Sequence, residues 1–217
     1  IRGEELASKI DQNPTLRYAK SCGMHLEFVS RSTYKDKTTP EYLKTLLEIF
    51  KDFYIIPEGG TNALAIKGCQ EILTETDQQF DVICCSVGTG GTLTGLINSS
   101  LPSQKIIGFP ALKGGFLNED ICKFATQSNW ELWEAYHFGG YAKVDSKLIT
   151  FMNHFKATYN IPLDPVYTAK MMYGIFDAIQ TGQIPKEAKV LAIHTGGLQG
   201  IEGMNLRLKQ KQLQTIV

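Results

Sequence analysis

Short runs of hydrophobic residues alternate with longer amphipathic stretches along most of the chain. The short runs predict β-strands at residues 25–30, 53–57, 81–87, 105–109 and 189–195. Several of them are hydrophobic without interruption, which is typical of parallel strands covered on both faces. The longer stretches predict helices at residues 14–22, 40–51, 62–76, 91–99, 146–158 and 169–180. This alternation favours βαβ units, so the sequence predicts a layered α/β fold with a mostly parallel sheet.

The polar segments and the chain ends indicate how the chain is divided into lobes. Residues 31–39 are polar, and we expect a division near residue 50, with residues 1–50 as the remainder of a small lobe and 51–217 as a large cofactor-binding lobe. Pro40 and Thr61 fit the starts of two of the helices. The polar tail, residues 210–217, is expected to fray. A lobe of about 50 residues is small for a domain, so we expect the small lobe to be incomplete and the chain to be the carboxyl-terminal portion of a longer protein.

The charge balance excludes several kinds of partner. The 217 residues include 22 Lys and Arg against 22 Asp and Glu, so the net charge is zero. Binding to nucleic acid or to an anionic membrane requires a basic excess, which this chain lacks. No hydrophobic run reaches the roughly 18 residues of a membrane span, and no export signal is visible at the amino end. We expect a cytoplasmic protein that binds neither nucleic acid nor membrane.

The cysteines and histidines give no support to a metal site or a disulfide framework. The five cysteines form no C-x-x-C pair, and Cys84 and Cys85 lie inside a hydrophobic run, where we expect buried thiols. The four histidines show no metal-binding spacing. We therefore expect no metal, and free thiols fit a reducing compartment.

A glycine-rich motif, Gly88-Thr-Gly-Gly-Thr92, directly follows the predicted strand 81–87 and opens a helix. In this arrangement backbone N–H groups converge on an anion at the helix N-terminus. The Walker pattern fails because no Lys-Ser/Thr pair follows, and the dinucleotide fingerprint fails because Leu93 stands where its last glycine belongs. A single monophosphate is the remaining ligand, and the alternative is a tight turn that only needs glycine.

Four segments together resemble one enzyme family. They are Ile56-Pro-Glu-Gly-Gly-Thr-Asn62, Ser86-Val-Gly-Thr-Gly-Gly-Thr92, Asp164-Pro-Val-Tyr-Thr-Ala-Lys170 and Ile193-His-Thr-Gly-Gly197. In this order they resemble the D-cysteine desulfhydrase / 1-aminocyclopropane-1-carboxylate deaminase family of pyridoxal-phosphate enzymes, which has the tryptophan synthase β-like fold (PLP fold type II). The resemblance extends from Ile1 to about Gly203. It implies pyridoxal 5'-phosphate as cofactor and a small amino acid as substrate, and we expect a homodimer.

The resemblance also implies roles for individual residues. The phosphate would be bound by Gly88, Thr89, Gly90, Gly91 and Thr92. Tyr141 and Tyr167 would be catalytic, and Thr168 and Thr195 would lie near the pyridine nitrogen. A tyrosine, with a pKa of about 10, can protonate a departing thiolate or bind the substrate carboxylate, although most tyrosines only pack their rings.

One departure from the family pattern bears on the reaction. The deaminases usually carry a glutamate after the Pro-Val-Tyr tyrosine, where this chain has Thr168. A hydroxyl does not hold a proton on the ring nitrogen as a carboxylate does, which suits β-elimination. The favoured reaction is therefore conversion of D-cysteine to pyruvate, ammonia and sulfide. Deamination of 1-aminocyclopropane-1-carboxylate is one alternative, and a non-catalytic fragment or paralogue that binds a phosphate metabolite such as a sugar phosphate is another.

The lysine that holds the cofactor covalently in this family, and a Ser-Asn-His segment, lie upstream of the matched region. Four lysines that do not occupy that motif are interpreted as solvated charges: Lys67, Lys113, Lys143 and Lys170. We therefore expect this chain by itself to be inactive, whatever the complete protein does.

Overall fold

The computed structural model describes residues 1–217, apart from the side chain of residue 116. The chain divides into two compact units, Ile1–Pro57 and Glu58–Val217. The sequence placed the division near residue 50, whereas these units divide between Pro57 and Glu58. Whether residues 1–50 are the remainder of a small lobe stays a prediction.

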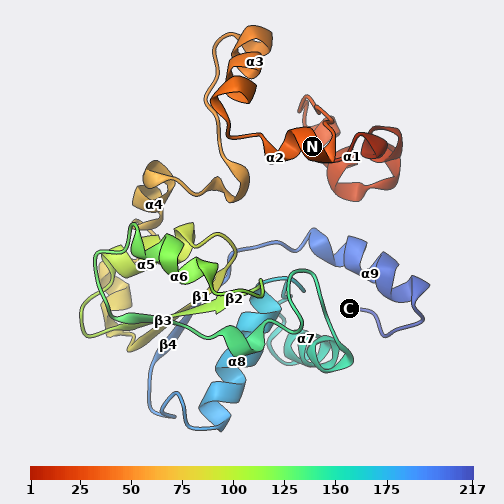
Figure 1. Ribbon diagram of the computed structural model, residues 1–217. Coiled ribbons are helices and arrows are strands. Elements are labelled where there is room, and N and C mark those ends of the chain that lie inside the picture. The colour runs from red at the N-terminus through yellow and green to blue at the C-terminus, as the bar shows by residue number, and fades with distance from the viewer. The chain divides into compact units, whose positions relative to one another are not determined.

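The first unit is helical. It contains a 3₁₀ helix η1 (Glu4–Gln12) and the α-helices α1 (Pro14–Ser21), α2 (Arg31–Lys35) and α3 (Pro40–Phe50), as Figure 1 shows. Asn13 caps α1 by accepting hydrogen bonds from the backbone of Thr15 and Leu16. Thr39 caps α3, and Pro40 lies in its first turn, as the sequence predicted.

The strands predicted in the first unit are wrong. Residues 25–30 form only an isolated bridge between Val29 and Arg2, and residues 53–57 form no strand. The polar segment 31–39, interpreted as a joint, contains α2. Among the described side chains of residues 1–57, no hydrophobic one is buried. A hydrophobic run without neighbouring strands or a core to cover it does not form a stable sheet.

The second unit is built on a parallel sheet. Its strands are β1 (Val82–Val87), β2 (Lys105–Pro110), β3 (Trp130–Leu132) and β4 (Val190–Ile193), in the order β3-β2-β1-β4. All three pairings are parallel, which confirms the predicted α/β class. The sequence located β1, β2 and β4 within one or two residues of their ends but missed β3, which has only three residues.

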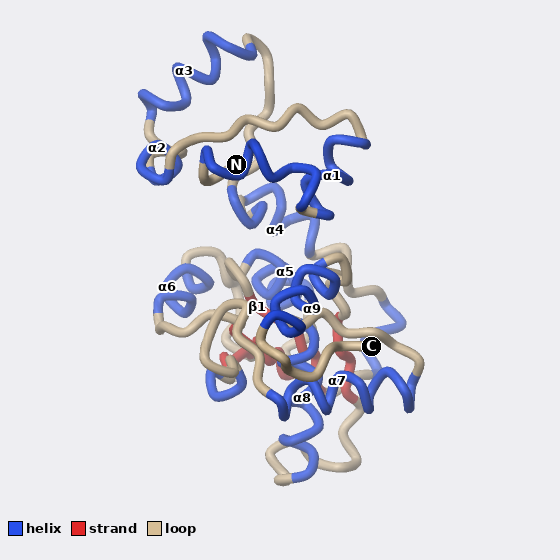
Figure 2. The backbone as a smooth tube through the Cα atoms, turned by 90° about the vertical axis from the view of Figure 1, so that its right-hand side faces the viewer, coloured by secondary structure: helices blue, strands red, loops and turns tan.

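Side chains alternate between the two faces of this sheet. Ile83, Cys85 and Val87 pack against α5 (Gly91–Ser99) and α6 (Phe116–Cys122). Val82 and Cys84 pack against α8 (Thr168–Gln180) on the opposite face. Figures 1 and 2 show the strands between these helices. Both cysteines are buried and free as expected, and burial raises the pKa of the Cys85 thiol to about 12.

The predicted helix 62–76 is divided in the structure. The α-helix α4 (Ala63–Cys69) ends early, and a separate 3₁₀ helix, η3 (Glu75–Gln79), follows after a turn. Thr74 and Asp77 form a capping box that starts η3, which explains the break. The cap of α4 is Asn62, whose side chain accepts from the Ala65 N–H, and not Thr61 as the sequence suggested. Two further 3₁₀ turns are η2 (Glu58–Gly60) and η4 (Glu134–Tyr136).

A further hydrophobic cluster joins α7 (Ser146–Tyr159), α8 and α9 (Gly200–Gln210). The sequence did not predict α9. The tail does not fray, because Asn205 bonds through its side chain to both the N–H and the carbonyl of Ile216, which is buried. In the part of the chain that is described, no helix combines the length and the hydrophobicity needed to cross a membrane.

Candidate active site

The glycine-rich loop lies at the carboxyl end of β1, one of the two inner strands of the sheet. The helix α5 begins at Gly91, the residue predicted from the sequence, and its cap Gly90 has a left-handed backbone with φ of 90°. No side chain caps this helix start. The N–H groups of its first turn have no partner inside the helix, and they carry the positive end of the helix dipole. They are therefore available to an anion.

The space around Gly90 and Gly88 is limited by neighbouring side chains. A Cβ added to Gly90 would lie 2.9 Å from Cγ1 of Ile121. A Cβ added to Gly88 would lie 3.3 Å from both Cε1 and the hydroxyl oxygen of Tyr167. The absence of a side chain at Gly88 thus lets the Tyr167 phenol lie directly against the loop.

Hydroxyl groups add further polar contacts to the loop. The Oγ1 atoms of Thr89 and Thr61 are 2.6 Å apart, so the loop is linked to the segment before α4. Thr92 is half-buried in the first turn of α5, with its Oγ1 4.0 Å from Sγ of Cys69. Thr61 was not among the predicted site residues, although it belongs to the motif 56–62. Uncapped backbone N–H groups with two threonine hydroxyls form a donor set that fits a phosphate monoester.

Tyr141 and Tyr167, which are 26 positions apart in the sequence, come together beside this loop. Their ring centroids lie 6.1 Å apart with an interplanar angle of 70°. Tyr141 is 56% exposed, whereas Tyr167 is half-buried. Burial, the neighbouring Tyr141 and the Asp164 carboxylate raise the pKa of Tyr167 to about 12. Tyr167 is therefore a protonated hydrogen-bond donor at neutral pH.

Asp164 organises the start of α8. Its carboxylate accepts hydrogen bonds from the N–H groups of Val166, Tyr167 and Thr168, the last at 2.7 Å. The Thr168 hydroxyl donates to the same carboxylate and accepts from the Asp164 N–H, and Thr168 is fully buried. That hydroxyl is thus engaged within the helix start, so contact with a ring nitrogen would require it to leave Asp164.

Thr195 lies in a different environment from Thr168. It follows β4, is exposed, and its Oγ1 lies 3.3 Å from the Oγ of Ser86 in β1. Both residues stand at the carboxyl edge of the parallel sheet, where ligands of open α/β sheets bind. Of the two hydroxyls predicted near the ring nitrogen, only that of Thr195 is accessible without rearrangement.

The sequence interpretation of Lys170 as a solvated charge is wrong. The residue is only 1% exposed, and its Nζ donates to the carbonyl oxygens of His137 at 2.9 Å and Gly140 at 2.8 Å. Burial lowers the pKa of this lysine to about 8, although the nearby Asp164 carboxylate acts in the opposite direction. Its place three residues after Tyr167 in a helix could have suggested that both face the same neighbours.

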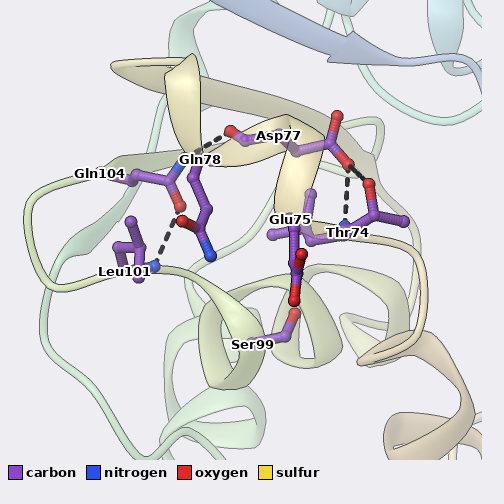
Figure 3. A pocket seen from close by; sticks show the side chains of 8 residues that line it. Thr74, Glu75, Asp77, Gln78, Ser99, Leu101 and Gln104 are labelled. Carbon is purple, nitrogen blue, oxygen red and sulfur yellow. Dashed lines mark hydrogen bonds between the residues drawn. The ribbon is translucent and has the colours of Figure 1, made fainter.

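A pocket of about 460 Å³ lies at the other end of α5, and Figure 3 shows its lining. Its polar groups pair with one another, since Gln104 donates to the carbonyl of Asp77 and accepts from the N–H of Leu101. The pocket opens at the amino edge of the sheet, between the end of α5 and the start of β2. It is therefore separate from the glycine loop and the tyrosine pair.

The fold and the site together define a parallel α/β protein with a candidate anion site at the helix that follows β1, one of the two inner strands of its sheet. Residues 7–196 match the family model described as "Pyridoxal-phosphate dependent enzyme". The chain therefore belongs to this family, and the cofactor of the family is pyridoxal phosphate. The described geometry of the glycine loop fits the phosphate of that cofactor.

Curated relatives carry two enzyme names. A protein from Pyrococcus horikoshii, provisionally named 1-aminocyclopropane-1-carboxylate deaminase, is 29% identical over 197 residues, covering 79% of this chain and 60% of its own length. A D-cysteine desulfhydrase from Klebsiella pneumoniae is 28% identical over 166 residues, covering 66% of this chain and 50% of its own length. The chain thus spans between half and two thirds of these relatives.

Solved structures show the same fold. The crystal structure of an ACC deaminase homologue matches 97% of this chain and 68% of its own with a TM-score of 0.78 and 25% identity. The structure of threonine deaminase isoform 2 from Solanum lycopersicum matches 90% of this chain and 61% of its own, with a TM-score of 0.53 and 20% identity. These neighbours confirm the predicted fold class, that of the PLP enzymes of fold type II.

Proposed function

We propose that the full-length protein containing this chain is a pyridoxal-phosphate lyase that eliminates sulfide from a small amino acid, with D-cysteine as the favoured substrate. The observation that carries the proposal is the position of the Tyr167 phenol, which occupies the space beside Gly88 that a side chain there would need and lies next to Tyr141. A protonated phenol thereby stands next to the anion site. The products would be pyruvate, ammonia and sulfide, with one water consumed.

In this proposal the loop residues Gly88, Thr89, Gly90, Gly91 and Thr92 hold the cofactor phosphate through the uncapped N–H groups of α5 and the threonine hydroxyls. Thr195 would be the hydroxyl partner of the pyridine nitrogen. Thr168, the other candidate, supports the site indirectly by holding Asp164 at the start of α8. When bound, the cofactor supplies the electron sink that weakens the bonds at the substrate α-carbon.

The tyrosines would bind the substrate and move a proton. The raised pKa of Tyr167 keeps its hydroxyl protonated, so it can donate to the substrate carboxylate or to the leaving sulfur. Tyr141 is exposed, with its ring next to that of Tyr167, and would contact the substrate beside it. A hydroxyl rather than a carboxylate at the ring nitrogen favours elimination, in which charge passes quickly to the leaving group.

Deamination of 1-aminocyclopropane-1-carboxylate is the second candidate. It is favoured by the provisional name of the Pyrococcus horikoshii relative and by the structural similarity to an ACC deaminase homologue. Thr168 in place of a glutamate argues against it. A third candidate, a non-catalytic phosphate-binding fragment or paralogue, would use the glycine loop and leave the tyrosine pair without a role.

The deciding experiment measures turnover of D-cysteine, L-cysteine and 1-aminocyclopropane-1-carboxylate side by side by the full-length protein loaded with pyridoxal phosphate. We expect sulfide and pyruvate from D-cysteine at the highest kcat/KM. Faster turnover of the cyclopropane compound would overturn the argument from Thr168. No turnover of any of the three, with the cofactor bound, would favour the non-catalytic candidate.

The expected assembly and location also remain proposals. We propose a homodimer in the reducing environment of the cytoplasm. All five cysteines are free, which suits that environment. Sedimentation equilibrium of the full-length protein measures the subunit count, and a monomer at micromolar concentration would contradict the proposal.

A further inference from the structure

One side of α8 holds the segment that carries Tyr141. Tyr167 is the cap residue of α8, and Lys170 and Tyr173 follow at intervals of three positions, so they are neighbours on the helix surface. The ring of Tyr167 contacts Tyr141, and the Lys170 ammonium bonds to two carbonyls of residues 137–140. The ring of Tyr173 packs edge-on against Phe138, with centroids 5.0 Å apart. Three side chains at the start of α8 thus contact the segment of residues 137–141, and Lys170 is the middle one of the three.

Residues 138–142 have an unusual backbone. Phe138, Gly139, Gly140 and Ala142 all have positive φ values, of 51°, 87°, 111° and 53°. Phe138 and Ala142 are not glycines, so this conformation costs free energy and persists only where surrounding contacts impose it. Two local bonds help, from the Gly140 N–H to the His137 carbonyl and from the Lys143 N–H to the Gly140 carbonyl. The Lys170 ammonium bonds to the same two carbonyls.

We propose that Lys170 is a positioning residue for the reaction: its ammonium fixes the carbonyls of His137 and Gly140 and thereby sets Tyr141 against Tyr167. The Gly140 carbonyl belongs to the peptide that leads directly into Tyr141, so its orientation fixes where the tyrosine begins. The proposal rests on the proposed function in so far as Tyr141 and Tyr167 act on the substrate. It assigns to Lys170 no contact with substrate or cofactor.

Stability alone does not account for a buried ammonium at this place. Removing a charged group from water is costly, and a hydrophobic side chain of similar volume often stabilises a buried site as well or better. Methionine has nearly the length of lysine and would fill the same space. What methionine lacks is the two charge-assisted hydrogen bonds, which are directional and hold the carbonyls in one orientation.

The test compares Lys170→Met with wild type and with Lys186→Met, which removes an exposed lysine after α8. The first measurement, hydrogen exchange in the full-length protein, does not depend on activity. In Lys170→Met we expect amides of residues 138–143 to exchange at least tenfold faster, with no change in β1 and α5. Unchanged exchange in residues 138–143, or a rise spread over the whole chain, would overturn the proposal.

The second measurement tests the connection to Tyr141. We expect Lys170→Met to lower kcat by about 10–100-fold while the affinity for pyridoxal phosphate is kept. Because Lys170 acts through Tyr141, the double variant Lys170→Met/Tyr141→Phe should be no slower than the slower single variant. Multiplying effects would overturn the proposal. If the wild-type protein turns over no amino acid, the proposed function fails, and the exchange measurement still tests the hold of Lys170 on this segment.

Chemical rescue keeps the test valid if Lys170→Met folds poorly. In Lys170→Ala, added ethylammonium can enter the space left by the side chain and donate to the same carbonyls. We expect it to slow the exchange of residues 138–143 again and to raise kcat, whereas tetramethylammonium, which has no N–H, should do neither. Equal effects of the two ions, or no effect of ethylammonium in a folded variant, would overturn the proposal.

Discussion

The phenol of Tyr167 lies beside Gly88 of the glycine loop, and its ring packs edge-on against that of Tyr141. We predict that Tyr167→Phe and Tyr141→Phe fold and bind pyridoxal phosphate normally but lower kcat by about 10²–10⁴-fold, which is the usual contribution of a positioned proton donor. Steady-state kinetics of the full-length protein with D-cysteine measure the effect. Tyr159, which is 50% exposed on α7, provides the control, and Tyr159→Phe should be active. Wild-type rates in both site variants would show that the two tyrosines only pack and take no part in the reaction.

A second prediction at the residue scale concerns the pH dependence of stability. The pKa of Lys170 falls from 10.5 to about 8 on folding. Below pH 8 the lysine is protonated in both states, whereas between pH 8 and 10.5 the unfolded chain binds the proton and the folded chain does not. The contribution of Lys170 to the free energy of unfolding therefore rises with pH across this window, by about 3 kcal/mol at most.

Urea denaturation at several pH values measures this contribution as the difference between wild type and Lys170→Met, since other titrating groups cancel. A difference that rises between pH 8 and 10 is expected. A flat difference would show that burial does not lower this pKa in the folded protein.

Among the elements, the start of α5 depends on a backbone that only glycine adopts easily. In Gly90→Val a branched side chain would meet both a φ of 90° and the Ile121 side chain at 2.9 Å. We predict at least a 100-fold loss of affinity for pyridoxal phosphate, because several charge-assisted hydrogen bonds to the phosphate depend on this turn. Titration of the full-length protein followed by absorbance measures it.

Gly182 offers a matched control for this variant. It also has a positive φ, of 77°, but open space around its Cβ position and no contact with the loop. Gly182→Val should therefore lose some stability and keep its cofactor affinity. Unchanged affinity in a folded Gly90→Val would mean that the loop has another role.

The packing of α4 on α5 gives a second prediction at this scale. A Cβ at Gly95 of α5 would lie 2.3 Å from Cβ of Cys69 in α4. We predict that Gly95→Ala destabilises the protein by about 1–3 kcal/mol, although alanine favours helices. Gly68, inside α4, has open space, so Gly68→Ala should stabilise by about 0.5–1 kcal/mol. Thermal and urea denaturation measure both, and a stabilising Gly95→Ala would refute the close approach of the two helices.

For the whole molecule, we predict that the 217-residue chain by itself does not attach pyridoxal phosphate covalently. Capture requires a reactive lysine held against the aldehyde. Lys170 is buried and engaged with two carbonyls, and none of the other lysines occupies the family motif. Borohydride reduction of the mixture followed by peptide mapping should label no lysine stoichiometrically. Stoichiometric labelling of one lysine, with Lys67, Lys113, Lys143 and Lys170 the first to check, would overturn the expectation that this chain alone is inactive.

The sequence by itself determined the parallel core and the position of the glycine loop at its edge. A short hydrophobic run such as residues 82–85 is typical of a parallel strand covered on both faces, and the glycines that follow it favour a tight turn into α5. Helix starts were also readable where a cap and a proline coincide, as at Thr39 and Pro40. These signals are local, so they require no knowledge of distant neighbours.

Only the tertiary structure decided features that depend on distant partners. The run at residues 25–30 forms no strand because no sheet pairs with it, whereas the polar tail is held by Asn205 and the buried Ile216. The sequence predicts Lys170 as a solvated charge, whereas in the fold it is buried and bonded to two carbonyls. These partners lie 30 and 33 positions away, so the local sequence could not indicate them. The physical reason is that burial and hydrogen bonding are set by what packs against a side chain, and sequence spacing fixes only its nearest neighbours.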